Sequence, residues 1–331
     1  MTLADIVIIG EAWGEIEERR REPFVGPSGK VLNWLLHQAG IARRECFLTN
    51  VFNLRPRPTN NILNLCGPKI GGIEPPLNKG KYIRQEYRGE LDRLHQELRN
   101  ESPNLILALG GTAAWAVLGT SGIRNVRGYI APSKFGKVLP TYHPSAVMRQ
   151  WELHAQVILD LQKAKREAEF PEIRRPQRRI YLEPSLSDME DFYREYLRPA
   201  RRVGCDVETV GDRVTCIGFG VREAAIVIPF LDPRNEDNNY FLDPETESLA
   251  WEWVHSVAWE KPLVFQNGMY DMSFLWKNHG IPVPSAEDTM LASHAQQPEM
   301  EKSLNFLGSI HTSELSWKHM RKSLTNKKDD L

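Results

Sequence analysis

Short apolar runs alternate with helical patterns over the first half of the chain, and this alternation constrains its fold more than any other feature. The runs predict buried strands, and the stretches between them place apolar residues at helical spacing. We expect strands at Ile6–Ile9, Cys46–Phe52, Leu105–Leu109 and Val138–Thr141, and helices at Gly29–Gln38, Tyr82–Asn100, Thr112–Leu118 and Ser145–Glu167. Strands that alternate with helices predict a three-layer α/β/α domain whose parallel sheet is covered on both faces.

The second half has a different order of elements. Strands are expected at Arg179–Leu182, Val203–Val207, Cys216–Gly220 and Ala225–Pro229, followed by helices at Glu247–Ala258, Asp271–Asn278 and Asp288–Ala295. Hairpin-linked strands followed by helices predict a mixed sheet with helices on its faces. Because the segment 170–179 is basic and broken by prolines, it predicts a linker between a domain at 1–169 and a domain at 180–331.

Composition excludes several classes of protein. With 41% hydrophobic and 26% charged residues, the chain is not mainly disordered. No apolar run approaches the roughly 18 residues that span a bilayer, so no membrane association is expected. Met1–Gly10 lacks the basic segment and cleavage site of a signal peptide, which favours a core strand and a cytoplasmic protein. The four cysteines form no C-x-x-C pair, which favours free thiols.

Charge is divided unevenly between the two halves. Residues 1–170 carry 23 Lys and Arg against 17 Asp and Glu, whereas residues 171–331 carry 19 against 26. A mildly basic half joined to an acidic half suits a nucleic-acid binder joined to a carboxylate-bearing metal site, although it suits many other proteins too.

The unusual residues of the first half follow its predicted strands. Gly10 and Glu11 come after the first strand, Asn50 ends the second, and His143 follows the last. Sites in parallel α/β folds gather at the carboxyl ends of strands, so we expect one site there. The proline-rich segment Arg55–Lys81 predicts a long surface loop, and a loop of this length is more often functional than idle.

The chemistry of these residues suits recognition of a base. Phe24 lies between Pro23 and Gly26 just before a helix, where its ring could be presented as a platform. Asn50 can donate and accept at once, as an amide does when it reads the edge of a pyrimidine. His143 at a helix start can donate to a carbonyl oxygen that gains negative charge during a reaction.

Four ordered motifs carry a family resemblance: G-E-A-W-G at 10–14, P-F-V-G-P-S-G at 23–29, T-N at 49–50 and H-P-S-A-V-M-R at 143–149. They resemble the uracil-DNA glycosylase superfamily, most closely its family 4 branch, over about residues 3–165. The resemblance implies that uracil is flipped out of DNA into a pocket. It implies catalytic roles for Glu11, Glu17 and His143, uracil-binding roles for Ala12, Phe24 and Asn50, and DNA-binding roles for Ser145, Val147, Met148 and Arg149. Val147 and Met148 would form the wedge that fills the vacated stack.

The chain departs from the family 4 pattern at several positions. Trp13 replaces the proline of the turn, and Arg21 stands where the family has a glycine upstream of the P-F-V-G segment. The family's iron–sulfur cluster needs four cysteines, but no cysteine precedes Gly10, Leu54 stands at the third position, and Cys66 alone cannot hold a cluster. We therefore expect no cofactor in this domain and no iron–sulfur cluster, with the Arg55–Lys81 loop stabilised in some other way.

The second half carries a set of carboxylates. Asp206 and Glu208 stand two apart on a predicted strand, so both project from one face. Asp271 follows an N-x-x-Y turn and adds a third carboxylate. Such hard oxygen ligands favour Mg²⁺ or Mn²⁺, and two such ions about 3.5–4 Å apart catalyse phosphodiester hydrolysis.

This pattern resembles the 3′–5′ proofreading exonuclease domain of family A DNA polymerases, over about residues 179–318. The resemblance implies a ribonuclease H-like mixed sheet, with Asp206 and Glu208 in the first motif and Asp271 in the second. The family's third motif, Y-x-x-x-D or H-x-x-x-D, is missing, so we expect an incomplete nuclease module and a family A polymerase polypeptide as a partner. Such a fusion suggests a bacteriophage source.

The resemblances together imply a two-domain protein of DNA repair and replication that hydrolytically excises uracil from DNA and leaves an abasic site. The alternative is a non-catalytic sensor of uracil in DNA that couples recognition to a polymerase. Scission of a uracil-containing strand after alkali would support the enzyme, and binding without scission would support the sensor.

Overall fold

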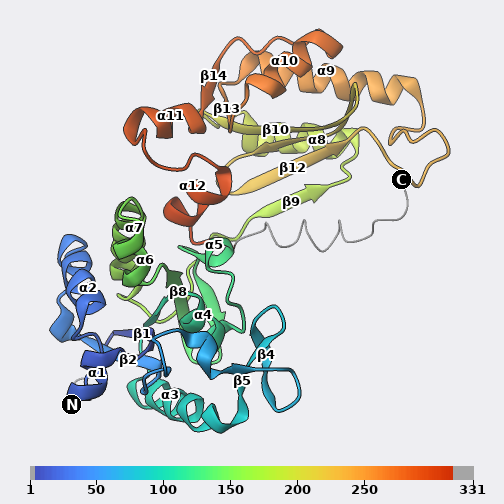
Figure 1. Ribbon diagram of the computed structural model, residues 1–331. Helices are drawn as coiled ribbons and strands as arrows, with labels where there is room; N and C mark the ends of the chain where they lie inside the picture. Colours follow the sequence, from blue (N-terminus) through green and yellow to red (C-terminus); the bar gives the residue numbers. More distant parts are fainter. Residues whose placement is uncertain (1–3, 316–331) are drawn as a thin grey trace. The chain divides into compact units, whose positions relative to one another are not determined.

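The computed structural model describes residues 4–315, and its contacts divide the chain into two compact units. The first unit spans the residues up to Arg174 and takes in the described residues from Asn305 onward, whereas the second spans Arg175–Leu304 (Figure 1). The boundaries expected from sequence, 1–169, 170–179 and 180–331, stay a prediction. Within the described range, no helix has the length and apolar character needed to cross a membrane.

The first unit is built on a five-stranded sheet in the order β2-β1-β6-β8-β7. Its strands are β1 (Ile6–Ala12), β2 (Cys46–Phe52), β6 (Leu105–Leu109), β7 (Ala131–Ser133) and β8 (Gly136–Thr141). The first four strands of this order are parallel to their neighbours, and only β7 runs antiparallel, against β8. The expected parallel sheet is therefore confirmed, with one short antiparallel edge strand added.

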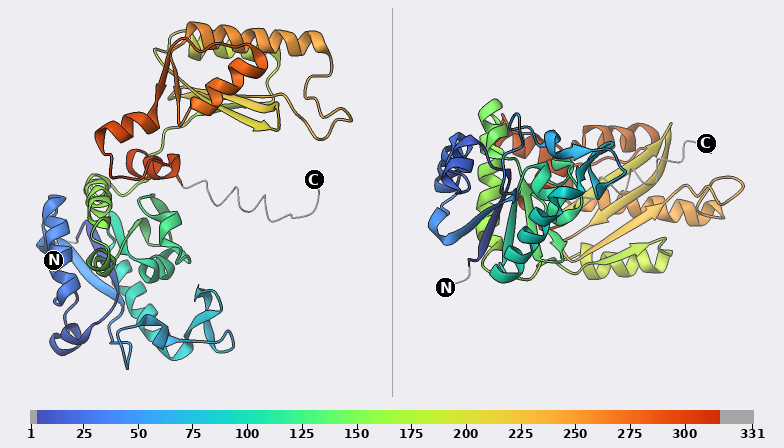
Figure 2. Two further views of the ribbon diagram at one scale, coloured as in Figure 1. Left: turned by 45° about the horizontal axis from the view of Figure 1, so that its top comes forward. Right: turned by 60° about the horizontal axis from the view of Figure 1, so that its bottom comes forward.

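Helices cover both faces of this sheet, as Figure 2 shows from two directions. In β1, Ile6 and Ile8 pack into one core, and Val7 and Ile9 into another. The first core is closed by α2 (Pro27–Gln38), α6 (Pro144–Arg149) and α7 (Leu153–Glu167), and the second by α3 (Arg88–Glu101) and α4 (Gly111–Leu118). Side chains of a strand alternate between its faces, so these two cores confirm the three-layer α/β/α arrangement.

The expected long loop contains a small sheet of its own. Strands β3 (Cys66–Gly67), β4 (Gly72–Asn78) and β5 (Lys81–Arg84) pair in the order β3-β5-β4. The expected helix from Tyr82 is therefore wrong in its first part, because β5 and a short 3₁₀ turn, η3 (Gln85–Tyr87), precede α3. Buried apolar side chains fix this sheet to the second core; they are Leu65, Ile73, Leu77 and Ile83.

Smaller elements complete the first unit. These are α1 (Glu15–Arg20), α5 (Ile123–Val126), and the 3₁₀ turns η1 (Arg43–Glu45) and η2 (Ile62–Leu65). The single helix expected over Ser145–Glu167 is divided into α6 and α7, because residues 150–152 leave the helical path. The sequence offered no proline or glycine to predict this break.

The second unit has a six-stranded mixed sheet in the order β14-β13-β10-β11-β12-β9. Its strands are β9 (Arg179–Leu182), β10 (Val203–Val210), β11 (Arg213–Gly220), β12 (Ala224–Pro229), β13 (Leu263–Phe265) and β14 (Ala286–Asp288). Its helices are α8 (Leu186–Phe192), the π-helical turn η4 (Tyr193–Leu197), α9 (Pro244–Glu260), α10 (Met269–His279) and α11 (Thr289–Gln296). The antiparallel β10-β11-β12 set beside parallel β13 confirms the mixed, ribonuclease H-like sheet.

Helix α12 (Leu304–His311) contributes most of its residues to the first unit, although the sequence placed it in the second domain. Arg127 donates to Asp160 Oδ1 at 2.6 Å and to Ser309 Oγ at 2.6 Å. The Lys163 ammonium donates to three backbone carbonyls, including that of Ser309 at 2.8 Å. These charges are buried, so their hydrogen bonds to α12 offset a large desolvation cost.

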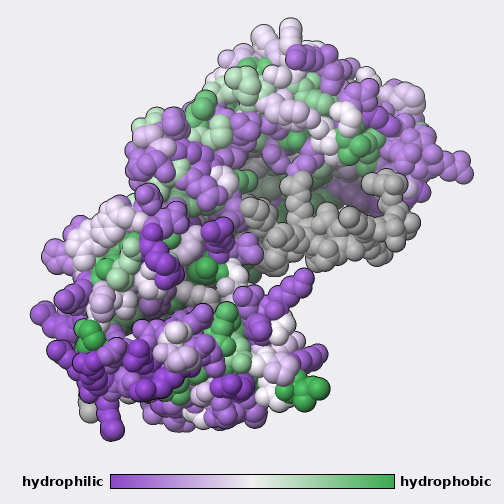
Figure 3. All heavy atoms as spheres, in the orientation of Figure 1, coloured by the Kyte–Doolittle hydropathy of each residue, from purple (hydrophilic) through white to green (hydrophobic). Residues whose placement is uncertain are grey.

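The face of each unit drawn in Figure 3 is mostly hydrophilic, with small apolar areas between polar side chains. Exposed apolar residues that stand singly are normal on protein surfaces. A contiguous exposed group of aromatic rings is less common, and one such group lies in the first unit beyond α6.

Candidate active site

A cavity of about 600 Å³ opens where β1 and β2 end and α6 begins. Most of the residues expected in the site line it: Glu11, Ala12, Glu17, Phe24, Asn50, His143, Ser145 and Met148. They come from segments that are far apart in sequence but adjacent in the sheet order. The structure therefore brings together the aromatic ring, the amide, the imidazole and the carboxylates that the motifs indicated.

Gly10 is the point at which β1 meets both the amide and the ring. In the parallel register Gly10 lies opposite Asn50. A Cβ at Gly10 would lie 2.2 Å from Asn50 Oδ1 and 2.5 Å from Phe24 Cζ. Contacts this short are forbidden, so only glycine lets these two side chains close over the strand end.

Phe24 is held in an unusual backbone conformation. Its φ is +56°, in the left-handed region that non-glycine residues rarely adopt. A Cβ at Gly29 would lie 1.9 Å from the Phe24 carbonyl oxygen, so the first turn of α2 packs directly on this backbone. Strained residues of this kind concentrate at ligand sites, where surrounding packing fixes them.

The buried carboxylate of Glu17 fixes the same loop from the other side. Glu17 Oε1 accepts a hydrogen bond from the Gly26 amide at 2.7 Å. A Cβ at Gly26 or at Gly14 would lie 2.8 Å from a Glu17 carboxylate oxygen. Glu17 therefore supports the loop that presents Phe24, in addition to lining the cavity.

His143 caps α6 with its own side chain. Its Nδ1 accepts from the Ser145 amide at 3.1 Å and lies 2.8 Å from Ser145 Oγ. Because Nδ1 is an acceptor, the neutral imidazole carries its proton on Nε2. Burial, with a smaller effect from the Arg149 charge, lowers the pKa of His143 to about 4. The ring also stacks near Phe24, with centroids 6.0 Å apart.

The Glu11 side chain extends into the cavity beside α4. Its Oε2 accepts from Thr112 Oγ1 at 2.5 Å. Burial raises the pKa of Glu11, against the opposing effects of the Thr112 hydrogen bond and the Arg149 charge. A carboxylate with a raised pKa is a stronger base when it is ionised, which suits the handling of water or a proton.

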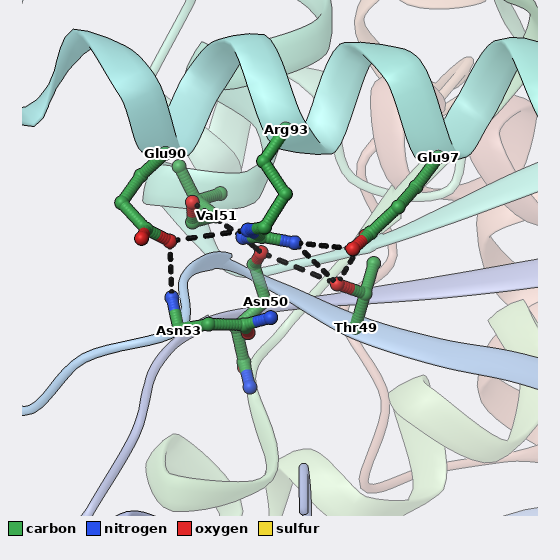
Figure 4. A network of polar contacts seen from close by, with 7 residues as sticks. All are labelled: Thr49, Asn50, Val51, Asn53, Glu90, Arg93 and Glu97. Atoms are coloured by element: carbon green, nitrogen blue, oxygen red, sulfur yellow. Dashed lines mark hydrogen bonds and ion pairs between the residues drawn. The ribbon is translucent and has the colours of Figure 1, made fainter. Parts of the chain in front are cut away.

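A polar network behind Asn50 is the part of the site that the sequence did not indicate (Figure 4). Arg93 of α3 donates to the backbone carbonyls of Asn50 at 2.8 Å and Val51 at 3.2 Å. The same guanidinium pairs with Glu97 at 2.7 Å and with Glu90 at 3.2 Å. Strand β2 is an edge strand with β1 as its single neighbour in the sheet. Arg93 holds the backbone at the end of this edge strand.

Two expected residues, Val147 and Arg149, do not line the cavity. Val147 has no exposed surface and packs in the first core, so it cannot serve as a wedge, because α6 turns it inward. Met148 is 51% exposed and lines the cavity, so a wedge would rest on this residue alone. Arg149 is exposed and does not line the cavity, although its charge acts on both Glu11 and His143. Trp13, where the family has proline, lines the cavity, and its buried Nε1 has no hydrogen-bond partner among the described residues.

The cysteines do not fit an iron–sulfur cluster. All four thiols are free, and among residues 4–315 no three His, Cys, Asp or Glu side chains are grouped so that they could hold a metal ion. Cys66 lies on β3, whose sheet is ordered by its apolar underside and by a 2.7 Å hydrogen bond from Trp115 Nε1 to the Pro75 carbonyl. The segment that follows Arg55 is thus stabilised by packing.

The carboxylates of the second unit are only partly brought together. Asp206 and Glu208 are exposed on one face of β10, and Asp271 is buried at the start of α10. Asp271 Oδ1 accepts from the Val207 amide at 3.0 Å, and burial raises the pKa of Asp271, with smaller contributions from the other two carboxylates. The expected Mg²⁺ or Mn²⁺ set is not assembled: Asp271 is engaged by the strand backbone, and in the described part of the chain no metal-binding group forms.

The first unit is thus an α/β domain with a cavity at the carboxyl edge of its parallel sheet, lined by an aromatic ring, an amide, an imidazole and carboxylates. A family model described as "Uracil DNA glycosylase superfamily" matches residues 2–171. Similar curated proteins include the type-4 uracil-DNA glycosylase of Thermotoga maritima, 34% identical and covering 48% of this chain and 76% of that protein. The type-4 uracil-DNA glycosylase of Archaeoglobus fulgidus is 31% identical, and the match covers 48% of this chain and 75% of that protein. The chain belongs to the uracil-DNA glycosylase superfamily.

Solved structures resemble part of the chain more weakly. The crystal structure of the Aedes aegypti Nibbler EXO domain matches with a TM-score of 0.34 and 12% identity, covering 48% of this chain and 81% of that one. A similarity at this level assigns no activity to the second unit.

Proposed function

We propose that the chain hydrolyses the N-glycosidic bond between uracil and deoxyribose in DNA. The observation that carries this proposal is the single cavity shared by Phe24, Asn50, His143 and Glu11. A flipped uracil stacks on the Phe24 ring, and the Asn50 amide pairs with its polar edge. Cytosine presents the opposite donor and acceptor pattern on that edge, so the amide discriminates against it.

The chemistry follows from the protonation states of two side chains. The bond from deoxyribose C1′ to uracil N1 breaks, and its electron pair leaves on the uracil. The neutral His143, with its proton on Nε2, donates to the uracil oxygen that gains this charge. Water adds to C1′ as hydroxide, and its proton passes by way of the Glu11 carboxylate to the departing base. The products are free uracil and an abasic site.

The DNA contacts are also proposals. Met148 is exposed beside the cavity and would fill the space vacated by the flipped base. Arg149 and Ser145 lie on the same short helix and would contact the phosphates. The backbone amide of Ala12 at the cavity would complete uracil binding.

The second unit remains an exonuclease-like module in this proposal. Its association with a family A polymerase, a bacteriophage source and a cytoplasmic location stay predictions from sequence. Magnesium-dependent shortening of a 5′-labelled oligonucleotide tests for nuclease activity, and replacement of Asp206 by Ala should leave uracil excision unchanged.

The test of the proposed function is alkaline cleavage of an oligonucleotide that contains one uracil. The reaction is run in EDTA, which silences any metal-dependent nuclease. We expect scission after alkali with the native chain, and loss of scission with Glu11→Gln at preserved DNA binding. Binding of uracil-containing DNA by the native chain without scission would overturn the proposal and support a non-catalytic sensor.

A further inference from the structure

An exposed cluster of three aromatic rings lies beside the candidate active site. Trp34 of α2 is 37% exposed, and Trp151, between α6 and α7, is 53% exposed. The ring centroids of Trp34 and Trp151 are 5.1 Å apart, and the His154 ring lies 4.7 Å from that of Trp151. His154 Nδ1 also lies 2.6 Å from the Trp151 carbonyl, which fixes the imidazole against the indole.

One face of the Trp151 indole is free of the other two rings. The centroids of Trp34 and His154 are 5.8 Å apart, so the three rings form a nearly equilateral triangle. If Trp34 and His154 covered opposite faces of Trp151, their separation would approach twice the ring-stacking distance. They therefore lie to one side of Trp151, which is 53% exposed.

The cluster is attached to the same elements as the cavity. Pro27 and Ser28 at the start of α2 line the cavity, and Trp34 follows Ser28 by six residues, or roughly 9 Å along a helix. Met148 on α6 lines the cavity as well, and Trp151 follows three residues later. The cluster and the cavity are therefore built on neighbouring parts of α2 and α6.

Basic side chains accompany the rings. Lys30 is exposed on α2 four residues before Trp34, which places both on one side of the helix. Arg149 is exposed two residues before Trp151. Aromatic faces beside basic groups are the combination with which proteins bind single-stranded nucleic acid, because every base offers a face for stacking and every phosphate a charge.

We propose that the Trp34–Trp151–His154 cluster is a stacking platform for an unpaired nucleobase next to the target uracil. The proposal rests on the proposed function, since it takes the uracil cavity as its reference point. A base in a duplex stays stacked between its neighbours and cannot reach the open face of Trp151. The platform therefore favours single-stranded DNA, or DNA opened around the uracil, as the substrate.

The experiment compares uracil excision from single-stranded and double-stranded oligonucleotides in EDTA. Trp151→Ala and Trp151→Leu remove the aromatic face, and the leucine keeps an apolar contact with the cluster. We expect each to raise KM for the single-stranded substrate roughly 10-fold or more at unchanged kcat, with a much smaller rise for the duplex. Trp151→Phe should keep part of the effect. Trp259→Ala is the matched control, because Trp259 is 59% exposed and lies parallel to His255 in the second unit.

Binding of a labelled, uracil-free single-stranded oligonucleotide, followed by fluorescence anisotropy, separates the two proposals. If the native chain excises no uracil, the proposed function fails, but weaker binding by Trp151→Leu still supports the platform. Unchanged KM and unchanged binding in Trp151→Leu would overturn the platform. A native dimer in sedimentation that becomes monomeric in Trp151→Leu would overturn it too, by assigning the cluster to contact between copies. Thermal unfolding of Trp151→Leu should match the native chain, and a KM effect present only with a lowered Tm would also overturn the platform.

Discussion

Gly10 shows how one residue type sets the geometry of the candidate site. Its backbone approaches Asn50 and Phe24 so closely that no side chain fits between them. Asn50 itself is only 3% exposed, so its amide is held by packing before any ligand arrives. Preorganised polar groups of this kind are the ones that contribute most to recognition, because they lose little freedom on binding.

Replacement of Gly10 by Ala tests this geometry. The added methyl group should displace Asn50 and Phe24 and lower kcat/KM for uracil excision by roughly 100-fold or more, since misplaced reacting groups lose about that much. Binding of uracil-free DNA should change little. Gly89→Ala on α3, where a Cβ meets nothing within 4 Å, is the control and should behave as the native chain. An unimpaired Gly10→Ala enzyme would show that this contact is not needed.

The half-buried imidazole of His143 should make stability depend on pH. Its pKa of about 4 lies below the ordinary value of 6.5. As the pH falls from about 6.5 to 4, the unfolded chain takes up a proton that the folded chain excludes, so the free energy of unfolding decreases over this window. Urea unfolding at several pH values should show this loss in the native chain and less of it in His143→Gln. Equal pH dependence in the two proteins would contradict a neutral His143 in the folded chain.

The ionised Glu11 carboxylate should lower the stability of the folded chain although it is needed for excision. Because burial raises its pKa, the folded chain disfavours the ionised form, and stability is lost as the pH rises through the raised pKa. Glu11→Gln removes the charge but can still accept from Thr112. We expect the variant to unfold at higher urea concentration than the native chain at pH 7 while excision is lost. A less stable Glu11→Gln protein at that pH would contradict this account.

At the scale of elements, the open edge of β2 is closed by one helix. Strand β2 borders only β1 in its sheet, and Arg93, Glu90 and Glu97 of α3 bind the polar groups at its C-terminal end. Glu90 accepts from the Asn53 amide at 2.7 Å, and Glu97 accepts from Thr49 Oγ1 at 2.7 Å. An unpaired strand edge would let Asn50 shift, so the helix contributes to the site without touching the cavity.

Arg93→Met tests whether the position of Asn50 depends on Arg93. The variant removes the guanidinium that donates to two backbone carbonyls and pairs with two carboxylates, and we expect the free energy of unfolding to fall by about 1–3 kcal/mol. KM for uracil-containing DNA should rise because Asn50 is less well held. Arg93→Lys keeps a donor and should recover part of the lost affinity and stability. Arg88→Met on the same helix loses only an exposed pair with Asp92 and should change stability by less than about 1 kcal/mol. Equal effects of the two substitutions would rule out a special role for Arg93.

At the scale of the whole molecule, the chain returns to its first unit after completing the second. The Tyr129 hydroxyl donates to the Asn305 carbonyl at 2.5 Å, and Arg127 and Lys163 bind Ser309. Ser309 is 1% exposed, so α12 is part of the interior of the first unit. The glycosylase-like unit is therefore assembled from two separated stretches of sequence.

Ser309→Ala tests this assembly. Loss of the hydroxyl leaves the buried Arg127 guanidinium without one of its acceptors, and we expect a destabilisation of about 1–3 kcal/mol. Because the effect falls on the first unit, the temperature at which uracil excision is lost should drop as well. Ser256→Ala is the control, because Ser256 is exposed on α9 of the second unit. If Ser309→Ala lost uracil excision at the same temperature as the native chain, a structural role for α12 would be contradicted.

The sequence by itself determined the class of fold and most of the candidate site. Alternating apolar runs define buried parallel strands, and Glu11, Asn50 and His143 follow strand ends, so these three could be expected to meet. Phe24 lies before a helix and was expected with them from the family resemblance. The sequence did not reveal the break between α6 and α7 or the inward orientation of Val147. These depend on which face of a helix meets the core, and a six-residue helix gives too short a pattern to decide it.

Only the tertiary structure decided which distant groups support the site. Arg93 looks like one more charged residue of an amphipathic helix, and its role follows from β2 lying at the edge of the sheet. Ser309 lies some 180 residues from Arg127 along the chain, and only the packed core brings them together. Local patterns reflect the periodicity of single elements, whereas hydrogen bonds between elements depend on the order in which strands and helices pack.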